Sequence, residues 1–360
     1  MIIMFCTLLG LLSILTAILP DREISISERR YLTRFPTLNA ATFRDGAFMQ
    51  NLEKYLPDQF PARDGFRAIK AIFERATLRM DTSGIYSYRG YLASLDMSYN
   101  PEQIEKTGEK LSTVKNRLLS DGRHAYISLI PPKNYYISME NDAYPTADYE
   151  GMRELLLSLP SMEDFSYIEL FDVLSLQDYY KTDSHWRSER LDPAVDALLS
   201  GMKRERAAAN YDTHSIEGFR GVYAGQAALP VCDEIMYYRT SDGIRGATVK
   251  YIAADISADT VYTLDRANDI DMYDIFLGGA VPVIEILNED APAGKLVIFR
   301  DSYGSSIAPL LVDSYREIVL IDLRYIALRY IPDFTDTTDA DFLFLYSTGV
   351  LGNSEMLRVN

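Results

Sequence analysis

The sequence predicts an α/β fold with a mostly parallel central sheet, and the prediction rests on two observations. Residues 295–299, 317–321 and 341–346 are short, almost uninterrupted apolar runs, which is typical of parallel strands that helices cover on both faces. A helical pattern over residues 307–315 separates the first two runs, and alternation of strands with helices is characteristic of such folds. We therefore expect three layers, with the sheet in the middle.

The middle of the chain continues this alternation. Apolar side chains recur at helical spacing over residues 104–118, and the apolar run 124–130 ends at two prolines, which indicates a helix followed by a buried strand. A helix over 148–159 and a strand over 167–170 are expected next. Asp192 and Pro193 then have the residue types of a helix N-cap and first helical position. From about 210 to 280 the pattern is mixed and rich in turns, so we expect an inserted region of short β-strands there.

The N-terminus is apolar, since residues 1–19 contain no charged side chain. As a helix, this run would be about 28 Å long, close to the hydrocarbon thickness of a bilayer. It fits a cleaved signal peptide, an uncleaved signal anchor or a buried helix. The lack of a polar face argues against a buried helix, and the lack of a basic leader and of a clear cleavage site favours an N-terminal membrane helix that acts as an anchor.

Three parts of the chain follow from these patterns: a signal anchor or signal peptide over 1–20, a stalk with N-terminal helices over 21–80, and the α/β domain over 81–360. In the second part, a turn with two prolines at 56–64 precedes a helix over 66–79. Three arginines follow the apolar run: Arg22, Arg29 and Arg30. By the positive-inside rule alone, they would place the rest of the chain in the cytoplasm. Acidic residues are interspersed among them, and we expect a membrane-anchored body on the extracytoplasmic face, or a secreted one if the anchor is cleaved.

The composition excludes several classes of protein. With 48% hydrophobic residues the chain is not disordered. It carries 36 basic and 52 acidic residues, a formal charge of −16, which argues against a nucleic-acid partner. Only two cysteines are present, and Cys6 lies in the apolar run, so neither a disulfide framework nor a cysteine-rich zinc site is expected. We expect no metal and no cofactor.

Two segments contain the residue types of nucleophilic acyl chemistry. Residues 179–186 hold Asp183 and His185, and residues 299–306 place Ser302 at a predicted strand-to-helix turn. A serine hydroxyl needs a base such as histidine to take its proton, and a carboxylate must orient the imidazole. In an extended segment Asp183 and His185 would point the same way. A serine at such a turn also has backbone N–H groups nearby that can bind an oxyanion.

Each segment alone also has a structural interpretation. An Asp-x-His pair is short, and Ser302 would in that case only cap the following helix. A metal site on Asp183 and His185 is disfavoured because His124 and His214 lie in unrelated contexts. The catalytic interpretation is favoured because both segments fall where one sheet edge of an α/β fold forms its ligand site.

The string Thr182-Asp183-Ser184-His185-Trp186 resembles the signature of the bacterial DHHW proteins, with Ser184 in place of the middle histidine. Residues 28–32, 58–64, 301–303, 322–325 and 344–347 add to the resemblance. DHHW proteins are similar to the SGNH-hydrolase-like domains of the alginate O-acetylation machinery. In those domains an Asp-x-His pair precedes the serine, as it does here.

The resemblance implies an SGNH-like α/β fold with Ser302 as nucleophile, His185 as general base and then acid, and Asp183 as the residue that orients it. It also implies an extracytoplasmic O-acetyltransferase or acetylesterase acting on a cell-envelope polysaccharide, with a membrane-bound O-acyltransferase as partner. The alternative is a catalytically silent polysaccharide-binding or assembly protein of the cell envelope.

Further site residues are less specific. The Ser302 amide would donate to the oxyanion, with Gly278, Gly279 or Asn288 as its partner, although the glycine pair fits a tight turn equally well. Arg324 is a candidate for holding substrate, with a structural ion pair as the alternative. Trp186 is a candidate for stacking on a sugar, with a packing role as the alternative.

Overall fold

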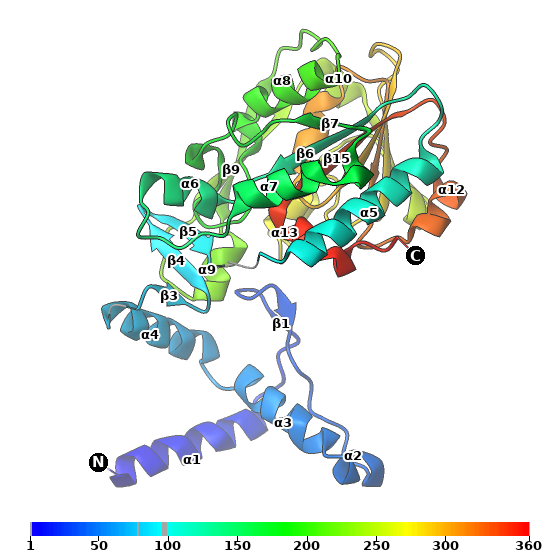
Figure 1. The fold of residues 1–360 in the computed structure, drawn as a ribbon. Helices are drawn as coiled ribbons and strands as arrows, with labels where there is room; N and C mark the ends of the chain where they lie inside the picture. The colour runs from blue at the N-terminus through cyan, green and yellow to red at the C-terminus, as the bar shows by residue number, and fades with distance from the viewer. Residues whose placement is uncertain (1, 78, 96–98, 360) are drawn as a thin grey trace. The chain divides into compact units, whose positions relative to one another are not determined.

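The computed structural model describes residues 2–77, 79–95 and 99–359. It divides into two compact units, and Figure 1 shows the helices and strands of the chain. The N-terminal unit comprises Met1–Ser94 and Arg220–Cys232, and the C-terminal unit comprises Leu95–Phe219 and Asp233–Asn360. The division therefore falls at residue 94, and one later segment of the chain belongs to the N-terminal unit.

The C-terminal unit is built on an eight-stranded sheet of order β11-β10-β12-β14-β13-β15-β6-β7. The five strands from β14 to β7 run parallel, whereas β12 pairs antiparallel with β14, β10 with β12 and β11 with β10. The three late apolar runs and the run at 124–130 all form buried strands, as predicted. The strands are β6 (Ala125–Ile130), β7 (Phe165–Ile168), β10 (Thr248–Tyr251), β11 (Ile256–Ala258), β12 (Val283–Leu287), β13 (Lys295–Arg300), β14 (Glu317–Ile321) and β15 (Asp341–Ser347).

Helices lie on both faces of this sheet. The connection from β13 to β14 contains α11 (Gly304–Ile307), and the connection from β6 to β7 contains α6 (Lys133–Glu140) and α7 (Tyr149–Ser158). These connections move in opposite directions along the strand order, so right-handed crossovers place their helices on opposite faces. The remaining helices of the unit are α5 (Pro101–Leu118), α8 (Asp192–Gly201), α10 (Asp242–Gly246), α12 (Ile331–Phe334) and α13 (Thr348–Leu351). Three layers result (Figure 1).

The predicted insertion at about 210–280 contains short strands, but they do not form a separate region. Strands β8 (Asp212–Phe219) and β9 (Glu234–Thr240) pair with each other, whereas β10 and β11 extend the central sheet through β12. These strands are three to eight residues long and partly exposed. Short, half-exposed strands have no continuous apolar run, which is why the sequence did not assign them to the main sheet.

The N-terminal unit contains helices and a small antiparallel sheet around a compact core of Ile85, Leu92, Ala224 and Ala227. Its helices are α1 (Ile2–Ile18), α2 (Ala40–Arg44), α3 (Ala47–Asp58), α4 (Arg63–Ala76) and α9 (Val222–Ala227). Its strands are β1 (Ile24–Ser25), β2 (Arg30–Tyr31), β3 (Asp81–Thr82), β4 (Ile85–Tyr88) and β5 (Tyr91–Ser94). The turn predicted over 56–64 is shorter in the structure: Pro57 lies inside α3, α4 begins at Arg63, and only residues 59–62, which include Pro61, connect the two helices.

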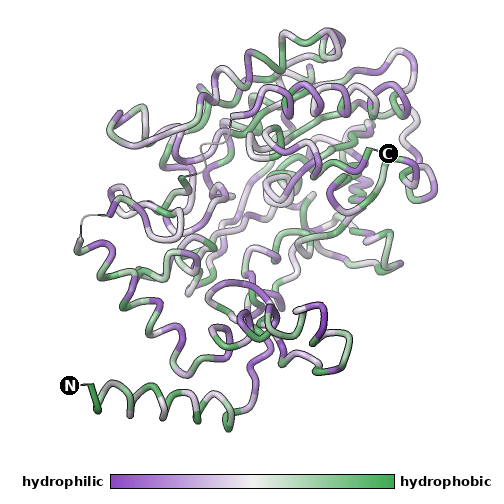
Figure 2. Tube along the Cα trace, turned by 60° about the horizontal axis from the view of Figure 1, so that its bottom comes forward, coloured by the Kyte–Doolittle hydropathy of each residue, from purple (hydrophilic) through white to green (hydrophobic). Residues whose placement is uncertain are grey.

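Helix α1 is apolar along its length (Figure 2). It has 17 residues, and in the described part of the chain no helix combines the length and hydropathy needed to cross a bilayer. The structure therefore does not support the predicted N-terminal membrane helix.

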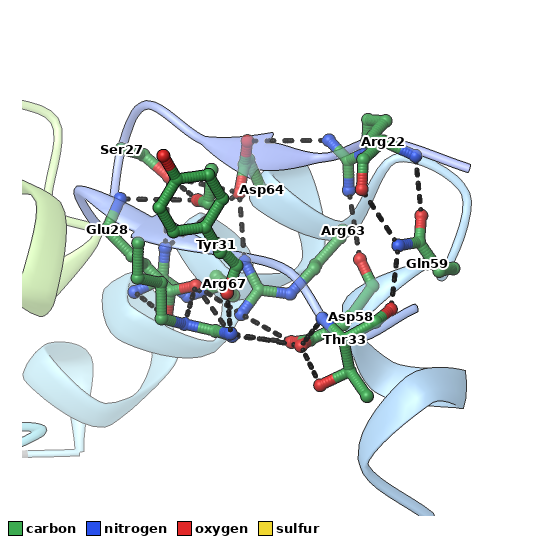
Figure 3. Close-up of polar contacts among 12 residues, drawn as sticks. Arg22, Ser27, Glu28, Tyr31, Thr33, Asp58, Gln59, Arg63, Asp64 and Arg67 are labelled. Atoms are coloured by element: carbon green, nitrogen blue, oxygen red, sulfur yellow. Dashed lines mark hydrogen bonds and ion pairs between the residues drawn. The ribbon is translucent and has the colours of Figure 1, made fainter. Parts of the chain in front are cut away.

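A buried carboxylate ties the polar parts of the N-terminal unit together (Figure 3). Asp58, at the end of α3, accepts hydrogen bonds from Arg30 at 2.5 and 3.0 Å and from the backbone and hydroxyl of Thr33 at 2.9 and 2.8 Å. The hydrogen bond from Arg30 holds the pKa of Asp58 well below its ordinary value, although burial opposes this. Asp58 thus fixes the β1–β2 hairpin to the α3–α4 turn.

Because the pKa of Asp58 is lower in the folded than in the unfolded chain, its contribution to stability is present above about pH 4 and is lost as the pH falls below that value. We expect Asp58→Asn to lower the free energy of unfolding of the N-terminal unit by roughly 2 kcal/mol at pH 7, and by much less at pH 3. Denaturant unfolding at the two pH values measures the difference. The control Glu53→Gln, at an exposed position of α3, should change neither value, and an equal loss at both pH values for Asp58→Asn would contradict this role.

Candidate active site

The structure brings Asp183, His185 and Ser302 together although 117 residues separate the histidine from the serine. The His185 Nδ1 lies 2.6 Å from Asp183 Oδ1, and its Nε2 lies 2.8 Å from the Ser302 Oγ. Asp183 is fully buried and His185 is 9% exposed. The three side chains form one continuous hydrogen-bonded chain, which is the arrangement that a serine nucleophile, its base and an orienting carboxylate require.

Ser302 is positioned by the turn that follows β13. The buried carboxylate of Asp301 accepts hydrogen bonds from the backbone N–H of Tyr303 at 3.1 Å and of Ser347 at 2.8 Å. Ser347 ends the neighbouring parallel strand β15. The nucleophile turn is thereby fastened to two adjacent strands at their carboxyl ends, the edge at which α/β folds build ligand sites.

The Asp183–His185 pair comes from a tight turn rather than from the extended segment that the sequence suggested. Hydrogen bonds from Tyr180 N to His185 O, at 3.1 Å, and from Arg187 N to Asp178 O, at 2.7 Å, close the loop. Within it, Asp183 Oδ1 accepts the His185 backbone N–H at 3.0 Å. An aspartate that bonds the backbone two residues onward favours this kind of turn, and here the same oxygen also holds the imidazole.

Two ionisable side chains hold the backbone of this loop through hydrogen bonds, and neither was identified from the sequence. The buried Lys133, which follows β6, donates from Nζ to the carbonyl oxygens of Tyr180 and Lys181 at 2.8 and 3.1 Å. Glu234, the first residue of β9, accepts from the backbone N–H groups of Lys181 and Thr182, both at 2.7 Å. Burial lowers the pKa of Lys133 to about 7, although Asp183 and Glu234 oppose this. We call Lys133 and Glu234 the loop clamp.

An aromatic wall supports the imidazole. The ring of Tyr273 stacks on His185, with centroids 3.9 Å apart and planes 12° from parallel. The Tyr273 hydroxyl and the Trp186 Nε1 both donate to the Ser306 Oγ, at 2.7 and 2.8 Å. Burial raises the pKa of Tyr273 well above its ordinary value, so this phenol stays neutral and remains a donor. The Ser306 hydroxyl therefore connects the histidine loop, the inserted region and the helix after the nucleophile.

Trp186 does not lie where a sugar could stack on it. Its side chain is completely buried, it packs edge-on against Tyr303 at 5.3 Å, and its only ring N–H is taken by Ser306. The predicted stacking role is therefore wrong, and the packing alternative is correct.

The candidates for a second oxyanion donor lie at opposite ends of the strands of the central sheet. Asn288 follows β12, whose C-terminal end pairs with the beginning of β14, so it lies at the opposite edge from Ser302. Its amide donates to the Val312 carbonyl at 3.1 Å. The structure thus does not bring Asn288 to the site, because β12 runs antiparallel to its neighbour.

Gly278 and Gly279 precede β12 and lie at the same edge as Ser302, because Val283 pairs with Ile321 and Ile321 pairs with Phe299. Both glycines have positive φ angles, 70° and 80°, as the tight-turn alternative requires. The N–H of Gly279 donates to the Phe276 carbonyl at 3.3 Å. Because the Gly279 N–H is already used in this bond, only Gly278 of the pair remains a predicted oxyanion donor.

Arg324 follows β14 at this edge, and it pairs with a buried carboxylate. Its Nε and Nη2 donate to the two oxygens of Asp322 at 2.9 and 2.7 Å, as the structural alternative predicted. Arg300, which precedes Asp301, is buried and donates to the Ser305 hydroxyl at 3.0 Å. Asp322 also lies 3.8 Å from Arg300, so one carboxylate balances two cations beside the nucleophile turn.

No family model and no curated protein matches this chain. Among solved structures, a DHHW family protein from Eubacterium siraeum matches with a TM-score of 0.62 at 19% identity, covering 77% of this chain and 94% of that one. Bacillus cereus PatB1 with a sulfonyl adduct matches with a TM-score of 0.60 at 19% identity, covering 77% of this chain and 100% of that one. The O-acetyltransferase domain of Pseudomonas putida AlgJ matches with a TM-score of 0.45 at 12% identity, covering 75% and 92%. The first two likenesses confirm the expected fold: this chain is folded like a DHHW family protein.

Proposed function

We propose that this protein is an acyl-transfer enzyme that moves an acetyl group through a covalent intermediate on Ser302. The observation that carries the proposal is the unbroken hydrogen-bonded chain from Asp183 through His185 to Ser302. The resemblance of residues 182–186 and 301–303 to DHHW proteins supports acetyl as the group transferred and a cell-envelope polysaccharide as the acceptor. We extend the proposal to an extracytoplasmic site of action and a membrane-bound O-acyltransferase as donor partner.

In the first half-reaction His185 Nε2 takes the proton of Ser302 Oγ as the oxygen attacks the carbonyl carbon of an acetyl donor. Asp183 stabilises the resulting imidazolium without accepting its proton. Collapse of the tetrahedral intermediate breaks the bond to the leaving group, which receives the proton from His185. Acetyl-Ser302 remains.

In the second half-reaction a sugar hydroxyl attacks the acetyl carbon and gives its proton to His185, which returns it to the Ser302 oxygen as that oxygen leaves. Water in place of the sugar gives acetate, so esterase activity is the accompanying reaction. The Ser302 N–H lies outside both β13 and α11, a position suited to donate to the oxyanion. The proposed second donor is Gly278.

Covalent labelling tests the proposal. Sulfonyl fluorides react with activated serine hydroxyls, and the PatB1 structure holds a sulfonyl adduct. We expect the protein to hydrolyse 4-nitrophenyl acetate, and a sulfonyl fluoride to stop this turnover by modifying Ser302, as located by peptide mass spectrometry. Absence of ester turnover together with saturable binding of a polysaccharide would instead establish the silent binding protein. Labelling of another serine with loss of turnover would overturn the assignment of the nucleophile.

A further inference from the structure

Helix α4 in the N-terminal unit is amphipathic, but its charged face points inward and its apolar face points outward. On the inward face, Glu74 is 8% exposed and the Arg63 side chain 12%. On the outward face, Phe66 is 46%, Ile69 64% and Phe73 67% exposed. A helix on a soluble protein ordinarily has the opposite orientation.

Hydrogen bonds and ion pairs within the unit fix this orientation (Figure 3). Arg67 donates from Nη2 to the carbonyl of Gly225 at 2.8 Å and lies 3.3 Å from Glu28. Arg63 lies 2.5 Å from the other oxygen of Glu28. Rotating the helix to bury its apolar face would leave these partly buried charges without partners, which is strongly unfavourable. The outward apolar face is therefore a fixed property of the fold.

The outward face is continuous. Phe66, Ile69 and Phe73 follow the i, i+3, i+7 spacing of one helix face, and Ile72, at 51% exposure, widens it. Beside them is a hollow of about 560 Å³, whose apolar wall is formed by Leu56, Pro57, Phe60 and Phe66. We call Phe66, Ile69, Ile72 and Phe73 the apolar face of α4; Leu56 and Pro57 of α3 and Phe60 of the following turn extend it. Contiguous exposed apolar surface of this kind marks an interaction site.

Charge identifies the occupant. At 100° per residue, Lys70 and Arg75 fall on the two flanks of the apolar face, and both are exposed. The N-terminal unit holds 13 of the 36 basic residues but only 9 of the 52 acidic ones, a balance of +4 in a chain of −16. Helices that lie in the plane of an anionic bilayer surface typically combine an apolar face, here of phenylalanine and isoleucine, with basic residues along its flanks.

We propose that the apolar face of α4 docks on the surface of an anionic lipid bilayer. Phe66, Ile69 and Phe73 enter the boundary between headgroups and acyl chains, and Lys70 and Arg75 contact lipid phosphates. This contact is separate from α1 and does not depend on the proposed acyl transfer, because none of its residues belongs to the candidate active site.

The test uses the full chain with Cys6→Ala and Cys232→Ala, so that a single introduced cysteine carries an environment-sensitive fluorophore. One variant has Ile69→Cys. The matched control has Met139→Cys in the C-terminal unit, where the methionine is 69% exposed. Each is mixed with vesicles of phosphatidylcholine alone or with one quarter phosphatidylglycerol, with and without a lipid-borne quencher, and binding is followed by sedimentation.

With anionic vesicles we expect the emission at position 69 to shift to the blue and to be quenched several-fold, while position 139 does not change. Adding Lys70→Glu and Arg75→Glu should weaken the effect at position 69 at least tenfold in lipid concentration. Unchanged emission at position 69 in sedimented protein would overturn the proposal, and so would an equal response to both kinds of vesicle. A blue shift of the emission at position 69 that grows with protein concentration in the absence of lipid would also overturn it, because the face would then bind a second copy of the chain.

Discussion

Replacing Ser302 with alanine is expected to lower the kcat for acetyl-ester hydrolysis by about 10⁴-fold or more, because members of a catalytic triad act as a unit. The fold should survive, since the Ser302 hydroxyl bonds only to His185 among the described residues. Steady-state kinetics with 4-nitrophenyl acetate measure the loss, and intact-protein mass spectrometry should show that acetyl no longer accumulates on the protein.

Ser188→Ala is the matched control for this variant. Ser188 is fully buried and its hydroxyl has no hydrogen-bond partner in the described part of the chain, so removing it should leave turnover within about twofold. Retention of full activity by Ser302→Ala would show that the nucleophile is another residue.

The second large effect is expected at the loop clamp. Lys133→Met leaves the buried carbonyls of Tyr180 and Lys181 without their donor, and Glu234→Gln removes the charge that holds the N–H groups of Lys181 and Thr182. A displacement of about 1 Å at a catalytic group can cost about 10²-fold. We expect Lys133→Met to lower kcat by about 10²- to 10³-fold and Glu234→Gln by about tenfold, with little change in KM.

Partial unfolding would also lower the apparent kcat at unchanged KM, because it lowers the concentration of active enzyme, so the kinetics have to be combined with a measurement of the fold. Thermal unfolding followed by circular dichroism supplies the second readout. Glu217→Gln, at an exposed position of the neighbouring strand β8, should behave as the parent. Equal kcat in Glu234→Gln and the parent would exclude a positioning role for Glu234.

The sequence predicted four of the five parallel strands as buried because each is an almost uninterrupted apolar run. The same reasoning located Ser302, since a serine directly after such a strand must lie at the carboxyl edge. Asp183 and His185 were found by residue type and spacing, although the geometry that joins them is a tight turn. Their meeting with Ser302 depends on the strand order, which no local pattern encodes.

The sites that the sequence missed or misplaced depend on properties of the tertiary structure that local sequence does not encode. Asn288 was misplaced because its distance from Ser302 depends on the direction of β12, and a strand of five residues does not reveal its direction. For Trp186 the sequence left stacking and packing open, because residue type alone does not give the burial of a side chain at a turn. Lys133 could have been noticed, since a lysine after the buried strand β6 and two prolines lies at the same edge as the nucleophile. Glu234 has no such signal, because its partners are 52 and 53 residues away.

The hydroxyl of Ser306 accepts from Trp186 and Tyr273 at once, and this shared acceptor has a consequence for how the protein can change. Substitutions at these three positions are expected to be non-additive, because the two donors share one acceptor and loss of the Ser306 hydroxyl breaks both bonds. Homologous chains should therefore exchange the three residues as a set. A designer who grafts the triad onto another scaffold has to transplant this set as well, or the imidazole will lose the stacked ring that keeps it in place.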